Sequence, residues 1–201
     1  MIIVLTGGIG SGKSMAAAIL NDMYGYPVYR ADSAVKRLYL TDKMLMSAIE
    51  SDAGQSFRTV DGIFSPNIMA DYIFSVPGAL EKVENRVFPA LLKDFEEWMS
   101  GCGSDVVVFE SATILEKPFF NGFGDVVIIV DAPLQMRINR AVDRDAVSYE
   151  KVMARVRRQK LMNDISDGRN VPEDAYICRN DGSLSQLGDR LKEIIEIINK
   201  K

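Results

Sequence analysis

The sequence predicts a doubly wound α/β fold with a parallel sheet, and three observations support this prediction. Fully apolar runs such as Val126–Val130 are typical of strands buried on both faces of a sheet. These runs alternate with helical stretches, the order of elements that gives a parallel sheet. A glycine-rich loop also joins the first strand to the first helix, which places a ligand site at the carboxyl edge of the sheet.

The first strand, Ile2–Leu5, runs into the pattern Gly7-x4-Gly12-Lys13-Ser14, which is a complete phosphate-binding loop. Glycines let the backbone approach phosphate groups, and the helix expected over Lys13–Met23 adds its partial positive charge. Lys13 can bridge the β- and γ-phosphates, and the Ser14 hydroxyl suits Mg²⁺. The alternative is a turn that only joins strand to helix, but Lys and Ser in place favour a nucleoside triphosphate site.

The other core elements follow from apolar runs and capping residues. Further strands are expected at 28–29, 106–109, 126–130 and 175–178. A helix begins at Pro133 and runs to about 142, and Ser148 can cap a second, basic helix that ends near 162. Ser183-x-x-Gln186 forms a capping box before a final helix with one apolar stripe.

A helical block interrupts the alternation of strands and helices. Helices are expected at 33–40, 42–51, 66–74 and 79–99, the last interrupted or kinked near Pro89. The whole chain, 1–201, is therefore interpreted as one domain. Its core comprises 1–37, 104–135 and 172–201, with an inserted helical substrate subdomain at about 38–99 and a helical lid at about 136–165.

Composition narrows the chemistry. The 201 residues are 47% hydrophobic and 26% charged, as in an ordinary globular protein, with no apolar run long enough to span a bilayer. Cys102 and Cys178 lack metal-ligand spacing, so reduced thiols in the cytoplasm are expected. The chain has no histidine, so proton transfer must fall to Asp, Glu, Lys or water.

The charge is unevenly distributed. The net charge of −4 argues against nucleic-acid binding, yet residues 137–160 contain eight Lys or Arg against three Asp or Glu. Such a segment can be a solvated helix face or a basic flap over phosphates, and the sequence leaves both open. The expected partners are small molecules, without nucleic acid or membrane, for a monomer or weak oligomer.

Acidic residues that follow strands are candidates for chemistry. Asp32 can cap the next helix, or it can accept a proton from an acceptor hydroxyl. Asp131 can cap a helix or contact a metal, while Glu110 and Glu116 can be structural or functional. The position of Asp32 beyond a strand, beside a phosphate loop in a chain without histidine, favours catalysis.

Four further motifs, added to the phosphate loop, resemble the dephospho-CoA kinase family over nearly the whole chain. They are Val28-x-x-Ala31-Asp32, Glu110-Ser-Ala-x-Ile-Leu-Glu116, Arg140-x-x-x-Arg144-Asp145 and Ile177-x-x-Asn180-x-Gly182. The resemblance implies ATP-dependent phosphorylation of the ribose 3′-hydroxyl of dephospho-CoA, which gives coenzyme A and ADP. It also implies that the fold is of P-loop kinase type, that the helical subdomain binds CoA and that the lid is mobile.

The resemblance also implies roles for particular residues. Asp32, Lys13 and Arg140 are expected to be catalytic, and Ser14 is expected to hold Mg²⁺. The residues expected to bind ATP are Gly8, Gly10, Ser11, Gly12, Lys13, Ser14, Met15, Arg144, Asn180 and Gly182, and those expected to bind the acceptor are Asp32, Lys36, Phe88 and Glu110.

Three positions depart from the family pattern. Phe88 stands where the family has His before Pro89, Arg30 replaces the first acid of an Asp-Ala-Asp stretch, and Met15 replaces Thr.

Two other functions remain as alternatives. Another small-molecule kinase, of the nucleoside monophosphate or shikimate type, would share the loop and lid arginines; a GTPase-like switch would need an Asn-Lys-x-Asp motif, which the chain lacks.

Overall fold

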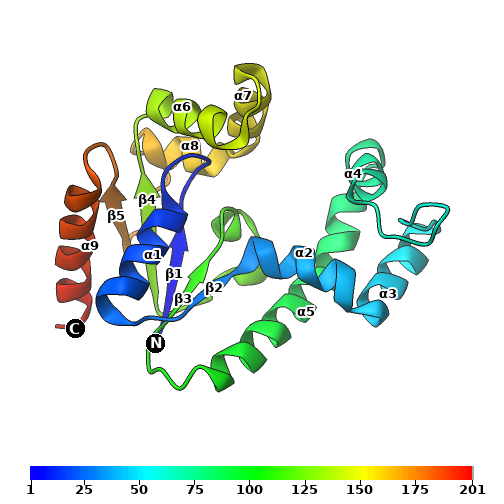
Figure 1. Cartoon of the computed structure of the whole chain (residues 1–201), viewed down its shortest axis with the longest axis horizontal. Helices are drawn as coiled ribbons and strands as arrows, with labels where there is room; N and C mark the ends of the chain where they lie inside the picture. The colour runs from blue at the N-terminus through cyan, green and yellow to red at the C-terminus, as the bar shows by residue number, and fades with distance from the viewer. Residues whose placement is uncertain (201) are drawn as a thin grey trace. The chain divides into compact units, whose positions relative to one another are not determined.

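The computed structural model describes residues 1–200, which divide into two units. The first unit comprises Met1–Arg30 and Gly103–Lys201, and the second comprises Ala31–Cys102. The first contains the sheet and the second is helical, as the colours of Figure 1 allow the reader to follow. No helix in residues 1–200 is both long and apolar enough to cross a membrane.

The first unit is built on a five-stranded sheet in the order β2-β3-β1-β4-β5, with every pairing parallel. Its strands are β1 (Ile2–Thr6), β2 (Val28–Arg30), β3 (Val107–Glu110), β4 (Val126–Asp131) and β5 (Ala175–Arg179). The central strand β1 pairs with β3 and β4, so the predicted parallel sheet is confirmed.

The sheet is buried by helices because its strands are apolar on both faces. α1 (Lys13–Tyr24) and α9 (Leu184–Ile198) cover one face, where Ala16, Leu20 and Leu191 pack against Ile3 and Leu5. On the other face, Ile129 of β4 packs against Met162 and Ile165 of α8 (Lys160–Ser166). The predicted capping box at Ser183 and Gln186 is present at the start of α9.

The predicted basic helix after Ser148 is not one helix. After α6 (Leu134–Asp145), the chain forms α7 (Tyr149–Arg158) and then α8, with a break between these two helices at Gln159. α6 and α7 pack through Ile138, Ala141, Val152 and Val156. Two short 3₁₀ helices, η1 (Ile114–Glu116) and η2 (Pro118–Phe120), also follow β3.

The second unit consists of α2 (Ala31–Thr41), α3 (Lys43–Ala53), α4 (Pro66–Ser75) and α5 (Ala79–Gly101). Its core is organised by α5, whose buried Val83, Val87, Leu91 and Phe95 recur every four residues along one face. α5 continues through Pro89, so the proline does not end the helix as one reading of the sequence suggested.

Candidate active site

The phosphate loop has the backbone conformation that its glycines predict. Gly10 and Gly12 lie at φ +71° and +100°, in the left-handed region that favours glycine. The carbonyl of Gly12 accepts hydrogen bonds from the N–H groups of Met15 and Ala16, so α1 begins directly at the loop. The positive end of this helix therefore faces the loop.

Three side chains from distant parts of the first unit hold this loop. Arg137 Nε donates to the carbonyl oxygen of Ile9 at 3.1 Å, and the N–H of Ile9 donates to Gln159 Oε1 at 2.7 Å. Asn180 Nδ2 donates to the carbonyl oxygen of Ser11 at 2.8 Å. The loop is thus fixed by contacts that do not involve a ligand.

Ser14 is joined to an acidic residue at the end of the neighbouring strand β3. Its hydroxyl donates to Glu110 Oε1 at 2.8 Å, and Arg30 Nε lies 3.3 Å from the other oxygen of the same carboxylate. Glu110 is only 8% exposed, and the register of β2 and β3 sets Arg30 directly opposite it. Arg30, which departs from the family pattern, therefore forms the ion pair that neutralises this buried carboxylate.

The turn after β5 lies beside the phosphate loop. Asn180 is 8% exposed, and its carbonyl oxygen accepts a hydrogen bond from Arg140 Nη1 at 3.1 Å. Its side chain contacts the phosphate loop, and the family resemblance places this residue among those expected to bind ATP. Arg144, one turn after Arg140 on α6, instead pairs with Asp145 at 2.8 Å.

Asp131 is the last residue of β4 and does not cap α6, whose N-cap is Pro133. Its buried carboxylate accepts hydrogen bonds from Ser166 and Arg179, so this acid joins α8 to β5. The carboxylate of Glu116 lies near the N–H groups of Leu161 and Met162 at the start of α8, and its Oε1 is buried without a hydrogen-bond partner among residues 1–200. Burial is the largest influence on the pKa of Glu116 and raises it.

Three predicted substrate residues belong to the helical unit. Asp32 is exposed in the first turn of α2, two residues beyond the end of β2. Lys36 is exposed one turn later on the same helix, so both side chains lie on one face. Phe88 is half-buried on α5.

Sequence reasoning missed Arg137 and Gln159. Arg137 is 1% exposed on the apolar face of α6, beside Ile138 and Ala141. A charged residue on a helix's apolar stripe is a detectable signal, because such a residue is rarely buried without partners. Gln159 gives no comparable signal.

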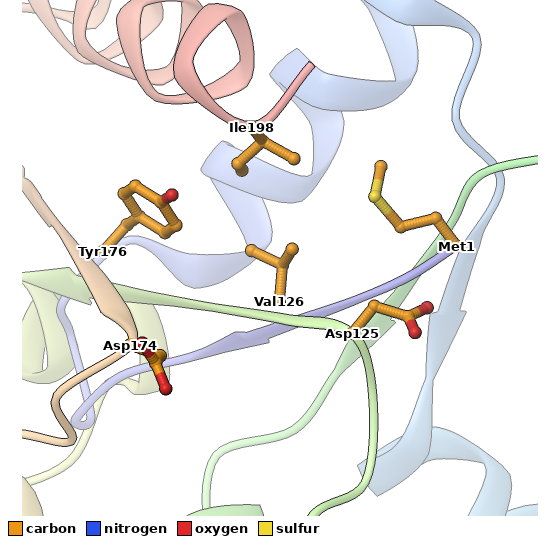
Figure 2. Close-up of a pocket in the computed structure, with 6 residues that line it drawn as sticks. All are labelled: Met1, Asp125, Val126, Asp174, Tyr176 and Ile198. Carbon is orange, nitrogen blue, oxygen red and sulfur yellow. The ribbon is translucent and has the colours of Figure 1, made fainter. Parts of the chain in front are cut away.

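A hollow of about 410 Å³ is lined by none of these residues, and Figure 2 shows the side chains that do line it. Its lining residues are Met1, Asp125, Val126, Asp174, Tyr176 and Ile198. Met1, Asp125 and Asp174 directly precede strands, so the hollow lies at the amino ends of β1, β4 and β5. Ligands of parallel sheets bind at the carboxyl ends, where the phosphate loop is found.

The parallel sheet and the glycine-rich loop between β1 and α1 define the fold of a P-loop kinase. The family model for dephospho-CoA kinase matches residues 1–186. The chain belongs to the dephospho-CoA kinase family. It is therefore a phosphotransferase with an alcohol acceptor, which uses ATP to phosphorylate dephospho-CoA in coenzyme A biosynthesis.

Individual relatives agree with this assignment. A dephospho-CoA kinase of Bacteroides fragilis is 31% identical over 198 residues, which cover 98% of this chain and 92% of the relative. One of Porphyromonas gingivalis is 40% identical over 156 residues, covering 78% and 76%. A crystal structure of a Thermus thermophilus protein matches with a TM-score of 0.81 and 29% identity, covering 98% of this chain and 96% of the other.

Proposed function

We propose that the γ-phosphoryl group of ATP is transferred over the loop Gly7–Ser14 to the ribose 3′-hydroxyl of dephospho-CoA. The observation that carries this proposal is the conformation of the loop, in which Ile9 and Ser11 are held through their carbonyl groups and Gly12 is the N-cap of α1. Backbone N–H groups of the loop, such as those of Gly10 and Gly12, are the proposed phosphate donors, because the N–H groups of Ile9 and Met15 already donate to Gln159 and Gly12. Lys13 would offset the negative charge that spreads over the transferring group.

Ser14 and Glu110 fit a magnesium site. The Ser14 hydroxyl donates a hydrogen bond to Glu110, which leaves the lone pairs of the hydroxyl oxygen available to a cation. Hydroxyl and carboxylate oxygens are ligands of the kind that Mg²⁺ prefers, usually alongside substrate phosphates. When bound there, Mg²⁺ would neutralise charge on the β- and γ-phosphates. Glu110 would then contact the metal site through Ser14, in addition to its expected role in binding the acceptor.

Asp32 is the proposed general base. Its exposed carboxylate can accept the proton of the 3′-hydroxyl as that oxygen attacks phosphorus, and the chain has no histidine for this task. Lys36, one turn along α2, would attract the phosphate groups of the acceptor. The ring of Phe88 offers apolar area against which the acceptor can pack, in place of the hydrogen bond that a His would donate.

The helices around 136–165 are the proposed lid, and the helical block around 38–99 is the proposed acceptor-binding subdomain. Arg140 and Arg144 would neutralise the transferring phosphoryl group and help to exclude water. Asn180 and Gly182 are proposed to border the adenine. Arg140 already contacts the Asn180 carbonyl, which supports a connection between the lid and this turn.

The setting of the reaction is also proposed. Both substrates are small molecules, and the net charge of −4 supports a protein that binds neither nucleic acid nor anionic membranes. A cytoplasmic monomer or weak oligomer with reduced thiols fits the composition.

A coupled assay of ADP release tests the proposal. Dephospho-CoA should be turned over in preference to AMP, adenosine, shikimate and pantetheine phosphates. Lys13→Ala should lose most of this activity while it keeps its fold, and Lys192→Ala, at an exposed position on α9, should keep the activity. Turnover of another acceptor but not of dephospho-CoA would reject the proposed acceptor. Full activity in folded Lys13→Ala would reject the proposed site.

A further inference from the structure

Arg137 is a buried cation behind the phosphate loop. It lies on α6, is 1% exposed, and donates from Nε to the Ile9 carbonyl at 3.1 Å and from Nη1 to Ser166 Oγ at 3.1 Å. Ser166 in turn donates to the buried Asp131 at 2.5 Å. Arg137 is therefore held by the loop on one side and by a network with an acidic end on the other.

The bond to Ile9 determines where the next N–H group points. In a trans peptide the C=O and N–H bonds are coplanar and point in opposite directions. Arg137 holds the Ile9 carbonyl on the side of the loop that faces α6. The N–H of Gly10, in the same peptide, therefore points away from Arg137. Asn180 holds the Ser11 carbonyl in the same manner, which orients the N–H of Gly12.

We infer that Arg137 is a positioning residue for the phosphates of ATP: it orients the Ile9–Gly10 peptide and supplies a fixed positive charge behind the loop. The inference rests on the proposed use of this loop for ATP. Preorganised N–H groups and fixed charges are most effective where water is excluded, as it is around Arg137.

The remaining nitrogen of the guanidinium, Nη2, explains why residue 8 must lack a side chain. An added Cβ at Gly8 would lie 1.9 Å from Arg137 Nη2, so Nη2 occupies the space of a side chain. Within residues 1–200, Nη2 makes no hydrogen bond. An unsatisfied buried donor has a cost in stability, and this cost is consistent with a residue retained for its charge and position.

The side chain of Gln159 completes the same arrangement. It accepts the Ile9 N–H at 2.7 Å, so both polar groups of Ile9 are bound by residues from the segment that contains α6–α8. Ile9 itself packs against the cluster of Ile138 and Val152. The position of the loop therefore depends on this segment, with Arg137 as its charged contact.

The first experiment measures Mg-ADP binding by calorimetry and the KM values for ATP and dephospho-CoA. Arg137→Gln should weaken ADP binding and raise the KM for ATP by about 10-fold or more, the effect of one charge-assisted hydrogen bond. The KM for dephospho-CoA should stay within about 2-fold, and Arg137→Lys should recover part of the ADP affinity because it keeps the charge. Arg169→Gln, which removes an exposed arginine with two ion pairs, is the matched control.

The second experiment uses the contact with Gly8. Gly8→Ala should weaken ADP binding strongly in the wild-type background, but it should have little further effect in Arg137→Gln, where the shorter side chain leaves space for the methyl group. Circular dichroism and thermal unfolding confirm that each variant is folded. Equal ADP affinity in wild type and Arg137→Gln, or an equal cost of Gly8→Ala in both backgrounds, would overturn the inference.

These readouts separate the inference from the proposed reaction. ADP binding does not depend on the acceptor, so a chain that binds ADP but fails to phosphorylate dephospho-CoA would reject the proposed function alone. A chain that phosphorylates dephospho-CoA with Arg137→Gln at full ATP affinity would reject the inference alone.

Discussion

At the scale of single residues, the acidic side chains at or just beyond the carboxyl ends of the strands have different environments. Glu110 is buried and engaged by Ser14 and Arg30, and Asp131 is engaged by Ser166 and Arg179. Asp32 is exposed at the start of a helix, where the helix dipole favours a carboxylate. The exposed carboxylate of Asp32 can meet an incoming hydroxyl group, whereas the carboxylates of Glu110 and Asp131 are buried and already bonded within the protein.

Asp32→Asn should lower kcat by roughly 10²-fold or more, because the amide keeps the size of the side chain and loses its ability to accept a proton. The KM for ATP should change little. Steady-state kinetics with dephospho-CoA check this, and Asp22→Asn in α1 serves as an exposed control. An unchanged kcat accompanied by a lower Tm would mean that Asp32 only stabilises α2.

Glu116 gives a pH-dependent prediction for stability. Its pKa is raised by burial, so the folded state favours the protonated form, and its contribution to stability is greatest below the unfolded pKa and declines as pH rises through the folded pKa. Glu116→Gln should therefore raise Tm by about 1–3 °C at pH 7.5, and the difference should disappear below about pH 4. Thermal unfolding across this range is the measurement. A lower Tm at pH 7.5 would show that the carboxylate's bonds to α8 outweigh its burial.

The two cysteines should react at different rates. Burial raises the pKa of Cys178 to about 11, so its thiol stays protonated at neutral pH, whereas Cys102 is partly exposed at the end of α5. Because the thiolate is the nucleophile, iodoacetamide should modify Cys102 and spare Cys178 in the native protein. Mass spectrometry before and after unfolding measures this, and equal labelling of both thiols in the folded state would contradict it.

At the scale of elements, sequence prediction succeeded where the cause is local. Ser148 and Ser183 each cap the start of the helix that they were expected to cap, because a side chain and an N–H group three residues away form the bond. The break at Gln159 was not predicted. The side chain of Gln159 accepts a hydrogen bond from the N–H of Ile9, which is 150 residues away in the sequence, so its cause is not local. Arg137 was missed for the same reason: its partners come from the loop and from α8.

The arginines of α6 show the same limit. Both lie on α6, which extends past its predicted end near 142, but their partners differ: Arg140 contacts Asn180, and Arg144 contacts Asp145. Asp145 also pairs with Arg155 at 2.8 Å, which joins the end of α6 to α7. Arg144 and Arg155 together hold the pKa of Asp145 below its usual range.

If the segment 136–165 closes over bound substrates, its exposure to protease should depend on ligand. Trypsin cleavage at the exposed Arg157 and Arg158 should slow when ATP analogue and dephospho-CoA are both present. Cleavage at exposed Lys200, beyond α9, is an internal control. Equal rates with and without ligands at all sites would identify α7 as a rigid surface helix.

At the scale of the whole molecule, the helical unit lies inside the sequence of the sheet unit. Residues Ala31–Cys102 form a continuous unit, while the sheet unit is assembled from the segments on either side. The sequence predicted an inserted helical block because strand-like runs are missing between about 38 and 99. It could not predict the order β2-β3-β1-β4-β5, which depends on pairing between distant segments.

This strand order has a consequence for synthesis on the ribosome. β1 is made first, yet its hydrogen-bonding partners are β3 and β4, whose pairing begins at Val107 and Val126. At a synthesis rate of roughly 10 residues per second, on the order of 10 s pass between the synthesis of β1 and that of its first partner strand. All of Ala31–Cys102 is synthesised during this interval. We expect nascent chains arrested after Cys102 has emerged to resist protease within 31–102 and to be cut near the phosphate loop. During this interval the apolar strand Ile2–Thr6 is a ready substrate for a chaperone.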